Sequence, residues 1–169
     1  MNVIVAIGGS FPDNSAEIFN VSTLQWTRSL NTMPGHLMGH TATLLPNEQI
    51  LVVGGGTIRP YLFNPTTKLF TFAADTIQPR NEPSVTLLPS GLVLITGGYY
   101  MDSIYRSAEV YDYRLNIWRS VLDMNTARFH HTSVVLNHSS STSPIVLVIG
   151  GKKELDTSST SCELFSINS

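Results

Sequence analysis

The chain has 169 residues, enough to bury a hydrophobic core, and its formal net charge of −2 excludes a general electrostatic attraction to nucleic acid or acidic membrane. Charged residues make up only 13%, about half of the usual ~25%, and no segment approaches the ~20 apolar residues that span a bilayer. A single cysteine, Cys162, cannot form an internal disulfide. This slightly favours a reducing compartment such as the cytoplasm, and localisation stays open.

The first predicted strand is the apolar run "VIVAI" at residues 3–7, which ends at Gly8 and Gly9. Two further strands follow, "AEIFN" and "LQWTRSL", separated by a short turn whose Asn and Thr residues favour tight turns. Phe19 and Trp26 are seven residues apart across this turn. We therefore expect a hairpin whose two aromatic side chains pack on each other or on a neighbouring unit.

The next unit repeats this order and adds a strand in front, "HTATLLP" from His40. It continues with "ILVVGG", "PYLFN" and "KLFTFAA", and the two aromatics Phe63 and Phe70 are again seven residues apart. The glycines that end the second strand, Gly54 and Gly55, permit positive φ and a close backbone approach.

The third and fourth units follow the same pattern. The third has "PSVTLLP", "LVLITGG", "AEVYD" and "NIWRSVL", with Tyr111 and Trp118 seven residues apart. The fourth has "HTSVVLN", "IVLVIGG" and "CELFS". The first glycines of the four pairs are 46, 43 and 53 residues apart. The repeat glycines are Gly8, Gly9, Gly54, Gly55, Gly97, Gly98, Gly150 and Gly151.

The repeating unit is thus a four-stranded antiparallel sheet of strands A to D, and no window shows a helical apolar stripe. A sheet with two apolar faces cannot bury both alone, whereas sheets stacked around an axis can, so the pattern predicts an all-β protein with a β-propeller fold. We expect one domain, residues 1–169, with blade I at 2–30, blade II at 37–74, blade III at 80–122 and blade IV at 128–169.

The motifs resemble the kelch repeat, in which each blade has Arg-x-x-His before the first strand, a diglycine after the second, an aromatic in the third and Trp in the fourth. Arg128 with His131 matches the first element completely, whereas Leu37 replaces Arg before His40, and Pro83 replaces His after Arg80. The resemblance covers nearly the whole chain and extends to the superfamily of galactose oxidase. It implies a kelch-type β-propeller.

Blade I lacks strand A and blade IV lacks strand D, which gives about three and a half to four blades in an incomplete ring. Propellers of the kelch family, which the chain resembles, are rings of five to seven blades. We therefore expect the chain to be a fragment of a larger protein, or a half-ring that self-associates through its open edges.

The B–C and D–A loops are expected to share one end of the sheets, and the B–C loops vary most in length, from 8 to 14 residues between the second glycine and the strand-C aromatic. Variable loops on a fixed scaffold are typical binding sites. Acidic residues on the same face, namely Asp13, Glu82, Asp102, Glu154 and Asp156, leave a solvated polar rim as the alternative. The candidate partner-binding residues are Arg59, Arg80, Tyr99, Tyr100, Tyr105, Arg106, Arg128, Phe129, His130, Lys152 and Lys153.

For Arg80 and Arg128 a structural role within the blade is a second alternative. Glu17, Glu109 and Glu163 each precede a strand-C aromatic by two residues, and strand periodicity places each carboxylate on the same sheet face as that ring. Because a buried carboxylate needs a partner, we interpret them as structural acceptors rather than catalytic acids.

We predict no metal site, no cofactor and no catalytic residue. The spacing of His36 and His40 has no helix behind it, and His40 and His131 are already explained by the repeat. Cys162 stands where other units have Ala, so we expect a small core-facing residue rather than the Tyr–Cys cross-link of copper enzymes resembling galactose oxidase.

Two functions remain. The first is a non-catalytic protein-interaction module with a protein partner and without nucleic-acid or membrane binding. The alternative is a fragment of a secreted galactose-oxidase-like or carbohydrate-binding propeller. A BTB-like or F-box-like region in the full protein would favour the first, and a signal peptide with a carbohydrate-binding domain would favour the second.

Overall fold

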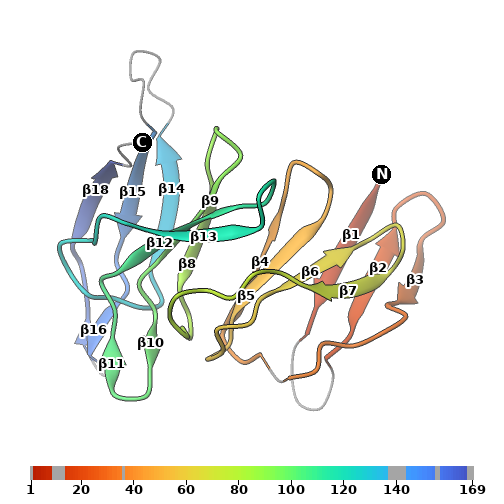
Figure 1. Ribbon diagram of the computed structural model, residues 1–169, viewed down its shortest axis with the longest axis horizontal. Coiled ribbons are helices and arrows are strands. Elements are labelled where there is room, and N and C mark those ends of the chain that lie inside the picture. Colours follow the sequence, from red (N-terminus) through yellow and green to blue (C-terminus); the bar gives the residue numbers. More distant parts are fainter. Residues whose placement is uncertain (1, 9–13, 36, 137–143, 155–156, 167–169) are drawn as a thin grey trace.

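The computed structural model describes residues 2–8, 14–35, 37–136, 144–154 and 157–166. Every regular element in these ranges is a β-strand, and the blade strands form four antiparallel sheets that follow one another in chain order (Figure 1). Within the described ranges no helix is long and apolar enough to cross a membrane.

Blades II and III are complete four-stranded meanders, and blades I and IV have three strands each. Blade I contains β1 (Val3–Ile7), β2 (Ala16–Asn20) and β3 (Gln25–Arg28). Blade II contains β4 (His40–Leu44), β5 (Ile50–Gly54), β6 (Tyr61–Asn64) and β7 (Leu69–Phe72). Blade III contains β8 (Ser84–Leu87), β9 (Val93–Thr96), β12 (Ala108–Asp112) and β13 (Ile117–Val121). Blade IV contains β14 (Thr132–Leu136), β15 (Ile145–Ile149) and β18 (Cys162–Ser166).

The predicted all-β, incomplete β-propeller is confirmed, because blades I and IV lie at opposite ends of the molecule and the ring is not closed (Figure 1). The sequence pattern did not predict two short hairpins in the B–C loops. These are β10 (Tyr99–Tyr100) with β11 (Ser103–Ile104), and β16 (Lys152–Glu154) with β17 (Thr157–Ser158).

The C–D turns owe their shape to one Asn or Asp residue each. The side-chain oxygen of Asn64 accepts hydrogen bonds from the backbone N–H groups of Thr66 and Thr67 at 2.9 and 3.1 Å, and the turn ends at Lys68 with a φ of 59°. Asn20 accepts the corresponding bonds in blade I. These turns fix a register in which the aromatics spaced by seven residues face each other, and the Phe63 and Phe70 ring centroids are 4.7 Å apart.

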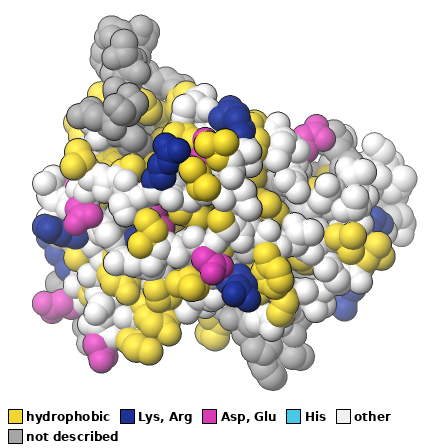
Figure 2. Space-filling model, in the orientation of Figure 1, with side chains coloured by type: hydrophobic (Ala, Val, Ile, Leu, Met, Phe, Trp, Pro, Cys, Tyr) yellow, Lys and Arg dark blue, Asp and Glu magenta, His cyan; other side chains and the backbone are white. Residues whose placement is uncertain are grey.

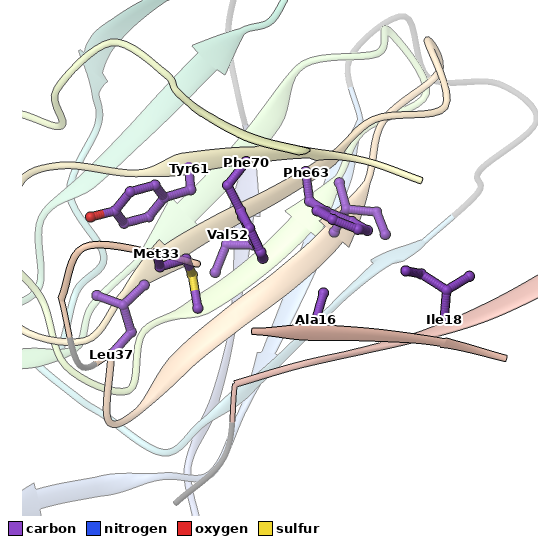
Figure 3. Packing of buried hydrophobic residues seen from close by; sticks show 9 residues of the cluster. Ala16, Ile18, Met33, Leu37, Val52, Tyr61, Phe63 and Phe70 are labelled. Carbon is purple, nitrogen blue, oxygen red and sulfur yellow. The ribbon is translucent and has the colours of Figure 1, made fainter. Parts of the chain in front are cut away.

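In blades II and III both apolar faces of the sheet are buried between blades, and blades I and IV each bury one face. The first inter-blade core joins Ala16 and Ile18 of β2 to the opposing face of blade II, where Val52 and Phe63 are fully buried (Figure 3). Equivalent cores join blade II to blade III and blade III to blade IV. Strand alternation therefore divides every sheet into one face for the preceding blade and one for the following blade.

The repeat glycines lie where backbones approach closely. All of them except Gly9, which is outside the described residues, have positive φ. A Cβ on Gly98, whose φ is 91°, would lie 2.7 Å from the carbonyl oxygen of Asn81. A Cβ on Gly151 would lie 2.6 Å from that of Phe129. Glycine is required here because the chain leading into strand A passes directly against the end of strand B.

The outward faces of blades I and IV have no neighbouring sheet among the described residues. Trp26 is 54% exposed in blade I, although its equivalent Trp118 packs against the core between blades II and III. Leu164 is 63% exposed in blade IV. Cys162 is also exposed, so the expectation that it faces the core is wrong. Its equivalents Ala16 and Ala108 are buried because a following blade covers them.

Candidate functional site

One end of the sheets, here called the loop face, is formed by segments 55–60, 80–83, 98–106, 128–131 and 151–154. The B–C loops and the segments that lead into strand A lie together here, as the sequence predicted, and backbone bonds join them. Asn81 and Tyr99 form an antiparallel bridge, and Phe129 and Lys152 form the equivalent one. The backbone N–H of Gly56 also donates to the carbonyl of Arg80 at 3.0 Å, which links blade II to blade III.

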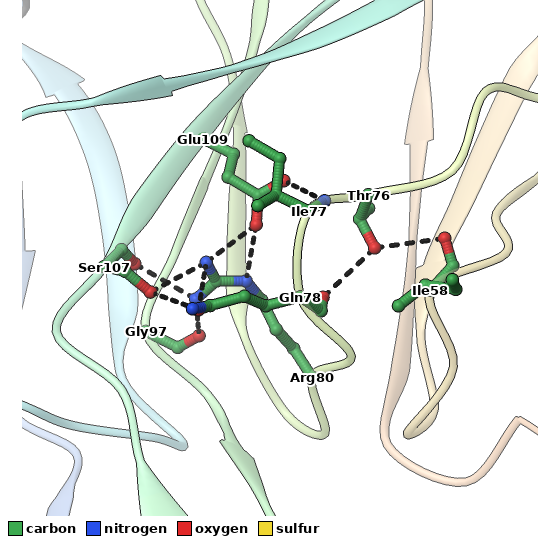
Figure 4. A network of polar contacts seen from close by, with 8 residues as sticks. All are labelled: Ile58, Thr76, Ile77, Gln78, Arg80, Gly97, Ser107 and Glu109. Atoms are coloured by element: carbon green, nitrogen blue, oxygen red, sulfur yellow. Dashed lines mark hydrogen bonds and ion pairs between the residues drawn. The ribbon is translucent and has the colours of Figure 1, made fainter.

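The Arg80 network fixes the base of this face in blade III (Figure 4). The guanidinium donates to Glu109 Oε1 at 2.8 Å, to the Gly97 carbonyl at 2.7 Å and to the Ser107 carbonyl at 3.0 Å. The other Glu109 oxygen accepts from the backbone N–H of Ile77 at 2.8 Å. The Arg80 and Glu109 side chains are 1% and 2% exposed, so this ion pair is buried and fully used by the protein itself.

Blade IV repeats the network with Arg128. This guanidinium donates to the carbonyls of Gly150 and Ser161 at 2.7 and 3.1 Å and to Glu163 Oε1 at 3.0 Å. The assignment of Arg80 and Arg128 as partner-binding residues is therefore wrong, and the structural alternative is correct. Each Arg holds the first glycine of a pair and the strand-C Glu, so Glu109 and Glu163 are structural acceptors as predicted.

Blade II replaces this ion pair with apolar contacts. Leu37 takes the place of Arg and Tyr61 takes the place of Glu, and both are buried in the first inter-blade core (Figure 3). In blade I, Glu17 instead receives a bond from Arg28 of the adjacent strand at 3.3 Å, in an exposed pair.

Tyr99, the first residue of β10, packs on the ring of Phe129. Their ring centroids are 4.9 Å apart, and Phe129 is only 3% exposed. Because its side chain is buried, Phe129 is a packing residue, so its assignment as a partner contact is also wrong. Tyr105 is half-buried, and the Cζ atom of the Arg80 guanidinium lies 5.3 Å from the centroid of the Tyr105 ring.

The β10–β11 hairpin tip is an exposed apolar part of the loop face, and Met38 in the segment that leads into β4 is similarly exposed, at 80%. Met101, which the sequence analysis did not single out, is 77% exposed and has a φ of 52°, and Tyr100 beside it is half-buried. Figure 2 shows hydrophobic side chains at the surface over the region of β10 and β11. The only feature of the sequence that marks Met101 is its position after two tyrosines in a predicted loop.

The remaining candidate cations are at the rim. Arg59 pairs with Asp75 at 3.6 Å and lies over the Phe72 ring, and Arg106 pairs with Asp123 at 3.2 Å. Both arginines are more than half exposed. Lys152 and Lys153 lie in β16, beside the segment that leads into β14. Of the acidic residues predicted on this face, Asp13 and Asp156 lie outside the described residues.

A cavity of about 330 Å³ lies beside the residues at the start of strand A in blades II, III and IV. His130 Nε2 lies 2.7 Å from Glu82 Oε2, and these two residues have φ values of 54° and 51°. Left-handed backbone is uncommon for such residues and is held here by the surrounding bridges. The cavity is lined by Gly39, His40, Glu82, Pro83, His130 and His131.

His131, in contrast to His130, points into the protein. Its Nε2 lies 2.9 Å from the hydroxyl of Thr96, and burial, with a smaller contribution from the Arg128 charge, lowers its pKa to about 4. The described residues include no group of three or more His, Cys, Asp or Glu side chains that could hold a metal ion. His36, the possible partner of His40, lies outside the described residues.

Four-stranded meanders stacked face to face, with diglycines closing each strand B, define the class of fold as a partial β-propeller. The family model of the kelch motif matches residues 89–125, which hold strands B, C and D of blade III and the β10–β11 hairpin. The chain thus contains a kelch motif, and its fold is a kelch-type partial β-propeller. No curated protein matched the chain.

Proposed function

We propose that the chain is a non-catalytic interaction module that binds a protein partner through the loop face, with the β10–β11 hairpin at the centre of the contact. The kelch motif indicates an interaction module in general terms. Binding through the hairpin is supported by the exposure of its tip. Met101 is 77% exposed, whereas the nearby side chains of Phe129 and Arg80 are buried.

The support makes the hairpin a suitable anchor. Tyr99 packs on the buried ring of Phe129, and its backbone bonds to Asn81 at 2.6 and 2.9 Å. A rigid apolar tip loses little conformational freedom on binding, and Tyr and Met are enriched in protein interfaces. The rim arginines Arg59 and Arg106 supply polar contacts around it.

The hydrogen bonds of the buried charged side chains support a non-catalytic role. The arginine and glutamate side chains of blade III, Arg80 and Glu109, are occupied by each other and by backbone groups. The copper-enzyme alternative has no observation in its favour, since Cys162 lies on the outward face of blade IV, opposite Ile149 of β15.

Affinity copurification with matched variants tests the proposal. Met101→Asp places a charge at the hairpin tip, and Leu115→Asp places one in the C–D turn at the opposite end of blade III, where Leu115 is 60% exposed. We expect Met101→Asp to lose a partner that wild type and Leu115→Asp retain. Equal retention by all three proteins would contradict the proposal.

A further inference from the structure

The methionines of the described residues fall into a buried pair and an exposed pair. Met33 and Met124 are each 1% exposed, whereas Met38 and Met101 are 80% and 77% exposed. Met1 lies outside the described residues. A hydroperoxide reacts with the thioether at its sulfur, so susceptibility to oxidation follows the exposure of the side chain. The fold therefore separates two methionines that an oxidant reaches from two that it does not reach.

The buried pair belongs to the cores. Met33 and Met124 occupy equivalent places in the repeat, each four residues before the residue at the Arg position of the motif. Met33 packs between blades I and II, and Met124 packs between blades III and IV. Their backbone N–H groups donate to the carbonyls of Asn14 and Arg106, both at 2.9 Å. Oxidation of either sulfur requires its core to open first.

The exposed pair lies at the loop face. Met101 follows Tyr100, the last residue of β10, and is part of the hairpin tip. Met38 precedes Gly39, whose carbonyl accepts from the backbone N–H of Glu82 at 2.9 Å. An oxidant that leaves the cores intact therefore acts on the surface that is proposed to bind the partner.

Oxidation at position 101 leaves the contacts that hold the hairpin in place. Those contacts are the two backbone bonds between Tyr99 and Asn81 and the packing of the Tyr99 ring on Phe129, and none of them involves Met101. The sulfoxide is polar where the thioether was apolar, and a polar group that is buried without a hydrogen bond weakens the contact. The change is therefore confined to the chemistry of the tip.

We infer that Met101 is a site of reversible oxidation that switches off binding at the loop face. This inference rests on the proposed function. The oxidant is a hydroperoxide: the sulfur attacks its outer oxygen, the O–O bond breaks, the S–O bond forms, and the proton passes to the departing oxygen to give an alcohol or water. The sulfur loses the two electrons that the peroxide gains. A thiol-dependent methionine sulfoxide reductase reverses the step, because two thiols supply two electrons and two protons, become a disulfide and release the oxygen as water.

The first measurement follows the oxidation itself. The chain carries Cys162→Ser, which removes the exposed thiol. It is treated with hydrogen peroxide, both folded and in urea, and each methionine is followed by mass spectrometry of its peptide. In the folded protein the buried pair should oxidise at least about tenfold more slowly than Met38 and Met101, because their cores must open first. In urea the four rates should be similar. Equal rates in the folded protein would overturn the inference.

The second measurement is partner retention in the affinity copurification, with each protein compared with its own untreated sample. Peroxide should lower retention by the Cys162→Ser chain at least about tenfold, because the tip becomes polar, and the reductase should restore it. In the same background, Met101→Leu has an apolar side chain without sulfur at the tip, so peroxide should not change the amount that this variant retains. Met38→Leu removes the other exposed sulfur and should stay sensitive. Loss of the partner from oxidised Met101→Leu, or retention by the oxidised Cys162→Ser chain, would overturn the inference.

The untreated samples judge the proposed function separately. If untreated Met101→Asp loses the partner and the oxidised Cys162→Ser chain retains it, the inference fails and the proposed function stands. If untreated wild type and untreated Met101→Asp retain the same proteins equally, the proposed function fails and the inference fails with it.

Discussion

Replacement of Glu109 by Gln tests the role of the Arg80 network. The substitution keeps the size of the side chain but removes the charge that compensates the guanidinium, and both side chains are at most 2% exposed. Arg80 would remain buried with an uncompensated positive charge. Removal of one partner of a buried ion pair costs about 3–5 kcal/mol, which is a large part of the ~5–15 kcal/mol that stabilises a domain.

The free energy of unfolding is measured by urea titration, with Trp118 as the probe. The Trp118 indole N–H donates to the Ala74 carbonyl at 2.9 Å, so its fluorescence follows the contact between blades II and III. A Trp26→Phe background makes it the only tryptophan. Glu17→Gln is the matched control, because the Glu17–Arg28 pair is exposed, and such pairs contribute about 0–1 kcal/mol.

Blade II suggests a rescue. The double variant Arg80→Leu with Glu109→Tyr copies the Leu37 and Tyr61 pair, and apolar replacement of a buried ion pair is often neutral. We expect it to recover most of the stability that Glu109→Gln loses. The reasoning is refuted if Glu109→Gln is no more destabilising than Glu17→Gln, or if the double variant is no more stable than Glu109→Gln.

Three further predictions concern other parts of the chain. His131 has a pKa near 4 when folded and an ordinary value of 6.5 when unfolded, so only the unfolded state gains this proton as the pH falls. Urea titrations should therefore show that the free energy of unfolding falls by up to about 3 kcal/mol between pH 7 and pH 4. His131→Gln should remove this part of the pH dependence, and a variant with the same pH profile as wild type would contradict the prediction. The expressed 169-residue chain should self-associate through its outward blade faces, and Trp26→Arg or Leu164→Lys should shift light scattering toward monomer, whereas a wild-type monomer at tens of micromolar would refute this. Purified protein should hold no stoichiometric copper by elemental analysis, and alcohol-dependent peroxide formation would overturn that expectation.

The repeat could be predicted from the sequence because residues close together in the chain determine it. Phe63 and Phe70 are joined by a short turn in which Asn64 accepts two backbone hydrogen bonds, so the local sequence indicates their pairing. The role of Glu109 was predictable as well, since strand alternation places a carboxylate beside a buried ring and requires a partner.

The loop face was less predictable, because its side chains are placed by contacts between distant segments. Phe129 packs on Tyr99, whose backbone is bridged to Asn81, and no local sequence pattern predicts that bridge. Cys162 shows the same limit in a strand. Alternation identifies its face of the sheet, but whether that face is covered depends on the presence of a following blade.

Photo-crosslinking tests the proposed binding through the loop face most directly. A photoreactive phenylalanine analogue at position 101 reports on the hairpin tip, and the same group at position 115 reports on the opposite end of blade III; the native residues there are 77% and 60% exposed. The proposal predicts that one partner crosslinks at position 101 and not at position 115. Crosslinking of that partner at position 115 alone, or equally at both positions, would contradict it.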